Sequence, residues 1–297
     1  MGRFQTSLEL AKTSWKVLQR DRELLWLPVI GFTLSALIAG VALGISFLVD
    51  YDIDTSTMEA GPATTVAWIV AGLAIATITS LVQGSLVSGA AERMRGGDPT
   101  VSSAIGGALA RLPQLLGWTI ITSTVGLILR AIRERSGIVG DIFAGLLDMA
   151  WQVITFLVVP VIVLEKKGPI EAVKRSTELL RTTWGENLIG RFGLGLVGML
   201  AMLPALVPIL IGVQLGGAGL VIGIAIGAVW IGLIAVIMTA LTAIYQTALY
   251  DFAANNHVPE DFVGTGLDTA FESREGGPNT GRGGFGGPFS SGGFGGR

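Results

Sequence analysis

Acidic residues are the side chains of this sequence whose spacing comes closest to a chemical site. Asp50, Asp52 and Asp54 alternate in the way that the first three ligands of a calcium-binding loop do. Such a loop also needs a glycine at its sixth position and a bidentate glutamate at its twelfth, where this sequence has Thr55 and Gly61. The spacing therefore favours a solvated acidic loop over a calcium site.

Other residue types that catalyse reactions or bind metals are scarce. The chain has no cysteine and one histidine, His257, which excludes thiol nucleophiles, thiolate metal sites and histidine-rich metal clusters. Asp141 and Asp148 share a helix face, but no base or nucleophile accompanies them. We interpret them as the polar side of an outer interfacial segment, Ile138–Met149, that answers the arginines before it. We expect no catalytic residue, no metal, no cofactor and no enzymatic activity.

The composition indicates a polytopic membrane protein. Hydrophobic residues make up 51% of the 297 residues and charged residues 14%, whereas soluble domains carry roughly 25% charged residues. Several uninterrupted apolar runs exceed the roughly 18 residues that mark a transmembrane helix. The net charge of −2 argues against nucleic-acid binding.

The apolar runs predict an all-α bundle of six transmembrane helices. About 20 apolar residues are needed to cross the hydrocarbon core. The six predicted spans are Leu27–Val49, Thr65–Ala90, Gln114–Leu129, Trp151–Leu164, Leu188–Val213 and Leu220–Tyr250. The third and fourth are short, and the sixth is long enough to project beyond the bilayer at one end.

The distribution of lysine and arginine sets the orientation, because cytoplasmic loops carry an excess of both. A cytoplasmic N-terminus places every Lys and Arg inside except Arg130, Arg133 and Arg135, and the acidic loop Asp50–Pro62 outside. We therefore expect a multi-pass protein of the cell membrane with both termini in the cytoplasm.

A charged segment between the fourth and fifth spans has the pattern of an amphipathic helix. Its apolar stripe consists of Ile170, Val173, Thr177, Leu180 and Trp184, and its polar face of Glu171, Lys174, Arg175, Glu178 and Arg181. Similar segments begin near residues 4 and 99, before the first and third spans. The order of one amphipathic helix and two spans therefore recurs three times.

This recurrence predicts three quasi-repeats at about residues 4–92, 99–165 and 169–252, within a transmembrane domain of residues 1–252. Residues 253–275 form a cytoplasmic polar segment. Residues 276–297 are rich in Gly, Ser and Phe, a composition that cannot bury enough surface to fold, and are expected to be disordered.

Basic residues of the amphipathic segments are candidate contacts to a lipid surface. They are Lys12, Lys16, Arg20, Arg111, Lys174, Arg175 and Arg181. In the other reading, these helices lie in the interface and only brace the spans. Membrane lipids, anionic ones among them, are the expected partners, and a protein partner or homo-oligomer is left open.

Small residues and prolines predict how the last spans pack. Gly219, Gly223 and Gly227 share one face of the sixth span and favour close helix packing within the bundle, with a dimer seam as the alternative. Pro204 and Pro208 remove backbone donors and predict a kink in the fifth span, either fixed or acting as a hinge.

Both ends of the sequence resemble a known family. Ser14-Trp15, Leu18 and Leu24-Leu25 before Pro28, together with Tyr250-Asp251-Phe252-Ala253, Val258-Pro259-Glu260-Asp261-Phe262 and Ala270-Phe271, resemble the signatures of a six-span membrane family classed as domain-of-unknown-function family 6159. The resemblance covers about residues 1–272. More loosely, the plan of helix plus hairpin is similar to the membrane region of some glycerophosphodiester phosphodiesterases, whose catalytic domain this chain lacks. Neither resemblance implies particular functional residues.

The favoured function is that of a non-enzymatic integral membrane protein that organises lipid or a partner through its inner basic helices. The alternative is a permease or exporter for a small apolar or lipid-like solute. A polar cavity lined by Gln83, Gln152 or Gln214 would favour the permease, and a filled bundle would favour the organising protein.

Overall fold

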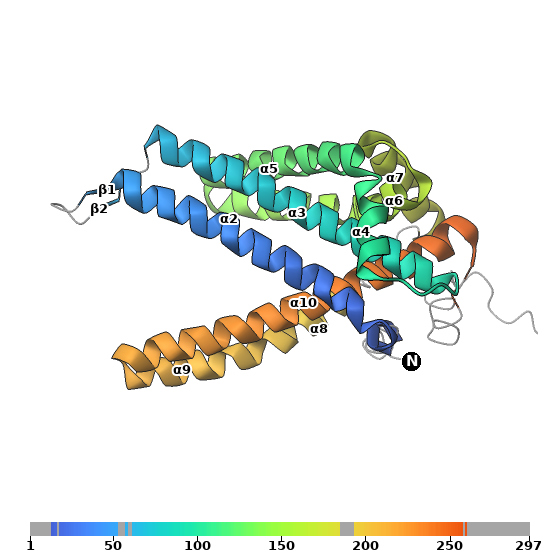
Figure 1. The fold of residues 1–297 in the computed structure, drawn as a ribbon. Coiled ribbons are helices and arrows are strands. Elements are labelled where there is room, and N and C mark those ends of the chain that lie inside the picture. Colours follow the sequence, from blue (N-terminus) through green and yellow to red (C-terminus); the bar gives the residue numbers. More distant parts are fainter. Residues whose placement is uncertain are drawn as a thin grey trace, which may run out of the picture.

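The computed structural model describes residues 13–16, 18–52, 57–58, 61–184, 193–257 and 259, and it is an almost entirely helical bundle (Figure 1). The all-α class is therefore confirmed. Lys12, the beginning of the first predicted repeat and the predicted disordered tail lie outside the described residues.

The described elements follow the chain from η1 to α10. They are η1 (Arg22–Leu25), α2 (Trp26–Asp50), β1 (Tyr51–Asp52), β2 (Thr57–Met58), α3 (Pro62–Met94), α4 (Val101–Leu109), α5 (Leu112–Ile154), α6 (Val158–Glu165), α7 (Pro169–Trp184), α8 (Gly193–Met202), η3 (Leu203–Ala205), α9 (Leu206–Leu215) and α10 (Gly217–Asn255). The two short strands pair antiparallel between α2 and α3.

Six helical segments are long and apolar enough to cross a membrane, as predicted. They are Arg22–Val49, Pro62–Met94, Leu112–Arg135, Gly140–Glu165, Gly198–Leu215 and Gly217–Asn255. The third and fourth are longer than the predicted Gln114–Leu129 and Trp151–Leu164. The prediction was too short because it ended these spans at charged residues that the helices in fact include.

Helix α5 is a helical hairpin: its chain turns back on itself, so that α5 contains the whole third span and part of the fourth. Trp118 and Trp151 stack with ring centroids 6.0 Å apart, whereas 33 residues of straight helix would separate them by roughly 50 Å. Arg133 Nη2 also lies 3.3 Å from Asp148 Oδ2, across the same hairpin. The prediction that Asp141 and Asp148 answer Arg133 and Arg135 is thus confirmed for Asp148 and Arg133. The prediction of a separate interfacial segment, Ile138–Met149, was wrong, since most of these residues belong to the fourth span.

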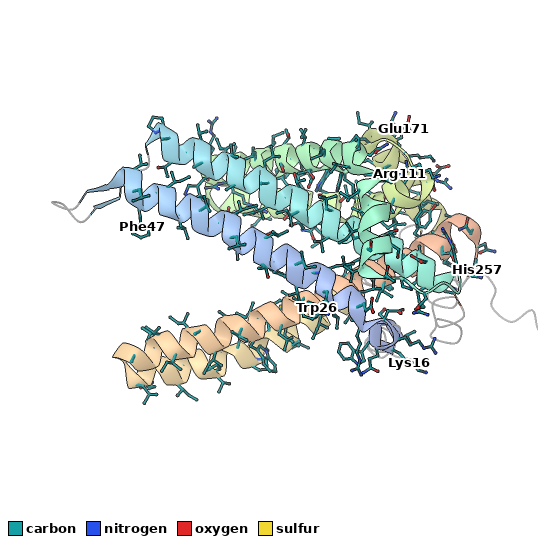
Figure 2. All side chains as sticks on the ribbon, viewed as in Figure 1. Lys16, Trp26, Phe47, Arg111, Glu171 and His257 are labelled. Atoms are coloured by element: carbon teal, nitrogen blue, oxygen red, sulfur yellow. The ribbon has the colours of Figure 1, made fainter. Side chains whose placement is uncertain are left out.

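The bundle has two distinct ends. The first end, here called the α4–α7 end, carries η1, α4, α7 and the C-terminal ends of α3, α6 and α10 (Figure 1). The opposite end carries the β1–β2 hairpin and the turn between α9 and α10 (Figure 1). Lys16 and His257, near the two ends of the described chain, lie at the α4–α7 end, and Phe47 lies at the other (Figure 2). A chain with six spans is expected to have both ends at the same end of the bundle, because the number of spans is even.

The buried core is concentrated toward the α4–α7 end. Leu24, Leu86, Ile162 and Ile244, from four different elements, and Leu157 from the turn between α5 and α6 are fully buried or nearly so and belong to one cluster. Toward the opposite end, α2 and the first half of α10 instead expose large apolar side chains to their surroundings. Such a surface suits lipid rather than water, because lipid tails are as apolar as these side chains.

The order of short helix and hairpin agrees with the predicted repeat in two places. Helix α4 precedes the α5 hairpin, and α7 precedes α8, α9 and α10. Helical residues 13–16 and 18–20 also precede η1 and α2. Whether the three units superpose is not tested by this order, so the threefold repeat stays a prediction.

Candidate functional site

Helix α7 lies across the α4–α7 end, with a buried face that differs in part from the predicted stripe. Ala172, Ser176, Leu179 and Leu180 are buried, whereas Ile170 remains 63% exposed. The hydrophobic pattern placed Ile170 in the stripe and Ser176 outside it. This part of the prediction was wrong, because a polar residue fills the centre of the contact.

Ser176 is buried because it binds the backbone where α5 ends and α6 begins. Its hydroxyl donates to the carbonyl oxygen of Ile154 at 2.6 Å and accepts from the N–H of Leu157 at 3.3 Å. Broken helices leave such backbone groups without partners, and a buried unpaired group is costly. Ser176 therefore joins α7 to the end of the fourth span.

Glu165 forms the main polar cluster between α6, α7 and α10. Its carboxylate lies 2.6 Å from Lys167 Nζ and 3.1 Å from Arg175 Nε, and accepts a 3.0 Å hydrogen bond from the Tyr250 hydroxyl. Arg175 also pairs with Glu178 at 3.0 Å. Hydrogen bonds to Glu178 and then to Glu165 raise the pKa of Arg175 above its ordinary value. Arg175, a predicted lipid contact, is thus engaged within the protein.

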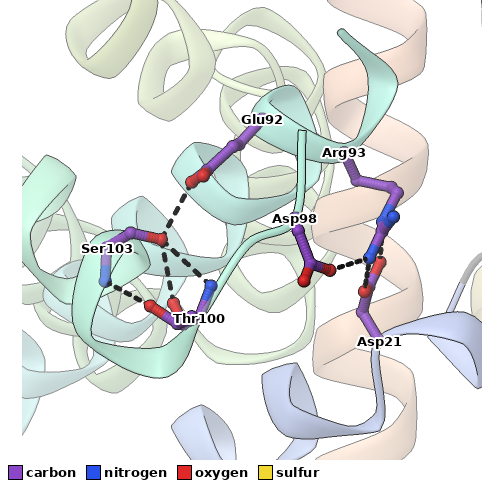
Figure 3. A network of polar contacts seen from close by, with 6 residues as sticks. All are labelled: Asp21, Glu92, Arg93, Asp98, Thr100 and Ser103. Atoms are coloured by element: carbon purple, nitrogen blue, oxygen red, sulfur yellow. Dashed lines mark hydrogen bonds and ion pairs between the residues drawn. The ribbon is translucent and has the colours of Figure 1, made fainter. Parts of the chain in front are cut away.

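A second polar cluster joins the residue before η1 to the end of α3 (Figure 3). Arg93 makes a bidentate contact with the buried carboxylate of Asp21 and a 2.8 Å contact with Asp98. Next to it, Glu92 accepts a 2.9 Å hydrogen bond from the Ser103 hydroxyl, and Ser103 forms a capping box with Thr100 at the start of α4. These contacts fix α4 against α3.

A cavity of about 480 Å³ opens beside this second cluster. Arg95 follows α3, Arg111 precedes α5, and Lys166 follows α6, and all three line the cavity. Ser88 and Glu92 of α3 and Gly107 of α4 contribute to the same wall. A phosphate or carboxylate is the chemical group that three such cations recognise.

A second cavity, of about 130 Å³, is apolar and lies between α2, α3 and α4. Leu27, Leu34, Leu81, Ile105 and Leu109 are among its lining residues. Ile105 and Leu109 face it from α4, whereas Gly107 faces the basic cavity. Helix α4 therefore separates an apolar cavity from a basic one.

The remaining predicted lipid contacts also belong to the elements of the α4–α7 end. Lys16, Arg20, Lys174 and Arg181 are exposed, and Arg111 is half-buried in the cavity wall. Figure 2 shows Lys16 and Arg111 at this end. The prediction missed Arg95 and Lys166. Lys166 lies two residues after the predicted fourth span and Arg95 five residues after the predicted second span, and this position shortly after a span was the signal that could have found them.

The three predicted packing glycines of α10 lie near the turn with α9. A Cβ on Gly223 would stand 2.4 Å from the carbonyl oxygen of Pro208, and one on Gly227 would stand 2.8 Å from Ile209. A Cβ on Gly219 would stand 2.5 Å from Leu215. The two helices thus approach closely within one chain. Pro204 lies in η3, between α8 and α9, and Pro208 lies in the first turn of α9.

Among the described residues, no group of three or more His, Cys, Asp or Glu side chains could hold a metal ion. Asp54 of the acidic loop lies outside them, so the preference for a solvated loop over a calcium site is not tested. The expectation that the protein is not an enzyme stays a prediction as well.

Comparison with known proteins adds one match. The model of a family described as Family of unknown function (DUF6159) matches residues 63–260, more than half of the chain. The match begins after the first span, so the predicted N-terminal signature lies outside it. A search of curated proteins finds no match. The looser likeness to glycerophosphodiester phosphodiesterases stays a prediction without support.

Proposed function

Because the chain belongs to the family described as Family of unknown function (DUF6159), we propose its role from its own geometry: it is a non-enzymatic membrane protein that binds anionic lipid at its α4–α7 end. The end faces the cytoplasmic leaflet of the cell membrane, and the chain termini lie on the same side. The observation that carries the proposal is an imbalance of charge at this end.

Internal ion pairs occupy many of the carboxylates there. Asp21 and Asp98 pair with Arg93, and Glu165 and Glu178 pair with Arg175. Several cations at the same end form no ion pair within the described part of the chain, namely Lys16, Arg22, Arg95, Arg111, Lys166, Lys174 and Arg181. The acidic residues there that pair with no described lysine or arginine are fewer, namely Glu23, Glu92, Glu171 and Asp251. The surface is therefore positive.

Helix α7 presents part of this charge in the geometry that an interface needs. Its buried face packs on α5 and α6, while Lys174 and Arg181 are exposed on it. Cations near an anionic membrane surface each contribute about 1 kcal/mol of attraction. This supports lipid as the partner over nucleic acid, which would need a larger excess of charge.

A permease for a small apolar or lipid-like solute is the alternative function. A polar cavity lined by Gln83, Gln152 or Gln214 would support the permease. The two cavities described above have other linings, and Gln152 and Gln214 are exposed on their helices. A binding role therefore agrees better with the described geometry.

The test is to purify the protein in native lipid and to measure which phospholipids are retained. The variant is the pair Lys174→Gln and Arg181→Gln on α7, and the matched control is Arg135→Gln, an exposed arginine beside the turn of the α5 hairpin. At about 1 kcal/mol for each cation, two losses lower the relative retention of anionic lipid by at most roughly thirtyfold.

The proposal predicts enrichment of anionic over zwitterionic lipid in the wild type, a clear decrease in the α7 pair and no change in the control. Equal retention of both lipid classes by the wild type would contradict it. So would a decrease of the same size in the control, because the effect would then not belong to the α4–α7 end.

A further inference from the structure

We propose that the basic cavity at the α4–α7 end is a binding site for one phosphate ester, and that Arg95, Arg111 and Lys166 hold its phosphate group. The inference rests on the proposed function in placing this end among lipid headgroups. It goes further, because it names a single saturable site, separate from the exposed cations of α7.

The first argument is that three separate chain segments bring cations to one cavity. Arg95 follows α3, Arg111 lies between α4 and α5, and Lys166 follows α6. These residues are far apart in the sequence, so no local repeat of charge brings them together. Folding alone places them around a space of about 480 Å³, within the range of roughly 300–1,000 Å³ typical of small-ligand sites.

The second argument is the charge of the cavity wall. Three cations against the single carboxylate of Glu92 leave two positive charges uncompensated. Arg95, Arg111 and Lys166 make no ion pair or side-chain hydrogen bond with any described residue. Arg93 and Arg175 at the same end each have two carboxylate partners. Charges that hold the fold are thus neutralised, and the cations around the cavity remain available to an anionic phosphate group.

The third argument is the backbone at Lys166. This residue has φ of 62°, in the left-handed region that favours glycine, although Gly168 is only two positions away. A side chain in that conformation is uncommon and costs roughly 1–2 kcal/mol. The conformation ends α6 and places Lys166 on the cavity wall. Helices commonly end in this conformation, and here it brings a cation rather than a glycine to the cavity.

The neighbouring polar groups indicate what accompanies the phosphate. Glu92 lines the cavity, and its carboxylate is held by the Ser103 hydroxyl at 2.9 Å (Figure 3). Ser88 lies on the same wall. A carboxylate and a hydroxyl accept hydrogen bonds from hydroxyl groups. The ligand is therefore a phosphate ester that carries a hydroxyl, and glycerol phosphate has this chemistry both as a lipid headgroup and free in solution.

Helix α4 approaches α3 closely enough to form this wall because it has a glycine at the contact. A Cβ on Gly107 would stand 1.9 Å from the Ser88 hydroxyl oxygen. Any side chain at this position would force α4 away from α3 and change the cavity. Gly107 is thus a positioning residue of the proposed site.

The experiment uses the full chain in nanodiscs and has two arms. In the lipid arm, native mass spectrometry counts phosphatidylglycerol molecules that stay bound after zwitterionic lipid is removed. In the soluble arm, the protein is kept in zwitterionic nanodiscs and glycerol 3-phosphate is titrated by calorimetry. The variants are Arg111→Gln and Lys166→Gln, and the matched control is Arg135→Gln beside the turn of the α5 hairpin. Lys174→Gln on α7 is measured beside them to separate the site from the exposed cations.

The expected result is one tightly held ligand in at least one arm. Loss of a charge-assisted contact weakens its binding by about tenfold or more in each cavity variant and leaves it unchanged in the control. Binding in the lipid arm alone identifies a headgroup, and binding in the soluble arm alone identifies a free phosphate ester. Arg111→Lys, which keeps the charge, retains most of the binding and shows that the loss in Arg111→Gln is not misfolding.

The inference is overturned if neither arm shows a saturable ligand, or if both cavity variants bind as the wild type does. Its failure differs from that of the proposed function. Retention of many anionic lipids that depends on Lys174 but not on Arg111 leaves the proposed function standing without the site. If the protein binds glycerol 3-phosphate in the cavity but shows no preference for anionic lipid, the site stands and the proposed function fails.

Discussion

Replacing Glu165 by alanine should lower the free energy of unfolding more than replacing any exposed charged residue at the α4–α7 end. Glu165 is only 17% exposed, and its carboxylate is shared by Lys167, Arg175 and Tyr250. The three partners come from the loop before α7, from α7 itself and from α10. Removing the carboxylate therefore breaks contacts between three parts of the bundle at once.

The magnitude follows from how exposed each partner is. Lys167 is 37% exposed, so its pair contributes at most about 1 kcal/mol. Arg175 is 28% exposed and keeps Glu178, so its loss costs about 1 kcal/mol. The Tyr250 hydroxyl is buried, and leaving it without an acceptor costs about 1–3 kcal/mol. Together these losses lower the free energy of unfolding by roughly 2–5 kcal/mol.

The assay is reversible unfolding in bicelles, followed by tryptophan fluorescence, for Glu165→Ala, Tyr250→Phe and the double variant. The two single changes should not add, with a coupling energy of about 1 kcal/mol. Glu178→Gln is the control, since Glu178 is 62% exposed and its loss should cost less than about 0.5 kcal/mol. Equal effects of Glu165→Ala and Glu178→Gln, or strict additivity with Tyr250→Phe, would refute the reasoning.

Three further changes test other contacts by the same unfolding measurement. Gly223→Ala should cost roughly 1–3 kcal/mol, because its Cβ would meet the Pro208 carbonyl at 2.4 Å, whereas Gly232→Ala, with no neighbour within 4 Å, should cost nothing. Asp21→Asn should cost about 2 kcal/mol by weakening the bidentate contact with Arg93, and Asp98→Asn, whose side chain is 92% exposed, less than about 0.5 kcal/mol. Ser176→Ala should cost about 1–3 kcal/mol by removing the partner of the Leu157 N–H and Ile154 carbonyl, while Ser176→Thr, which keeps the hydroxyl, should cost less. A control as damaging as its matched variant would count against the contact concerned.

The sequence predicts the class and the six spans well, because long apolar runs have few alternatives to membrane helices. It underestimates the third and fourth spans because Arg130 and Asp148 interrupt the apolar pattern. In the structure Arg130 pairs with Glu134 and Asp148 with Arg133, so these charges are compensated within the hairpin. A local hydropathy window has no means of recognising such a partner 15 residues away.

The candidate site is harder to predict because its residues meet only after folding. The helical pattern finds Lys174 and Arg181, whose exposure follows from the period of α7. It misassigns Arg175, since the carboxylate that binds it belongs to the preceding span and also binds Tyr250, 85 residues away from Glu165. It misses Arg95 and Lys166, which lie outside the amphipathic helices and meet at one cavity.

Ser176 is a buried polar residue that hydrophobic periodicity cannot predict. Hydrophobic periodicity assigns a buried face by apolar residues, and Ile170 belongs to that pattern. The structure buries Ser176 because the break between α5 and α6 offers an N–H and a carbonyl that need a partner. Only knowledge of where a neighbouring helix breaks would have predicted this contact.

The orientation of the bundle in the membrane is the claim on which the lipid proposals depend, and the absence of cysteine makes it directly measurable. Single cysteines replace Lys174 or Arg95 at the α4–α7 end, and Arg135 beside the turn of the α5 hairpin, and intact cells are treated with an impermeant maleimide. The account predicts labelling of Arg135→Cys alone, with Lys174→Cys and Arg95→Cys labelled only after lysis. Labelling of Lys174→Cys in intact cells, with Arg135→Cys protected, would contradict it.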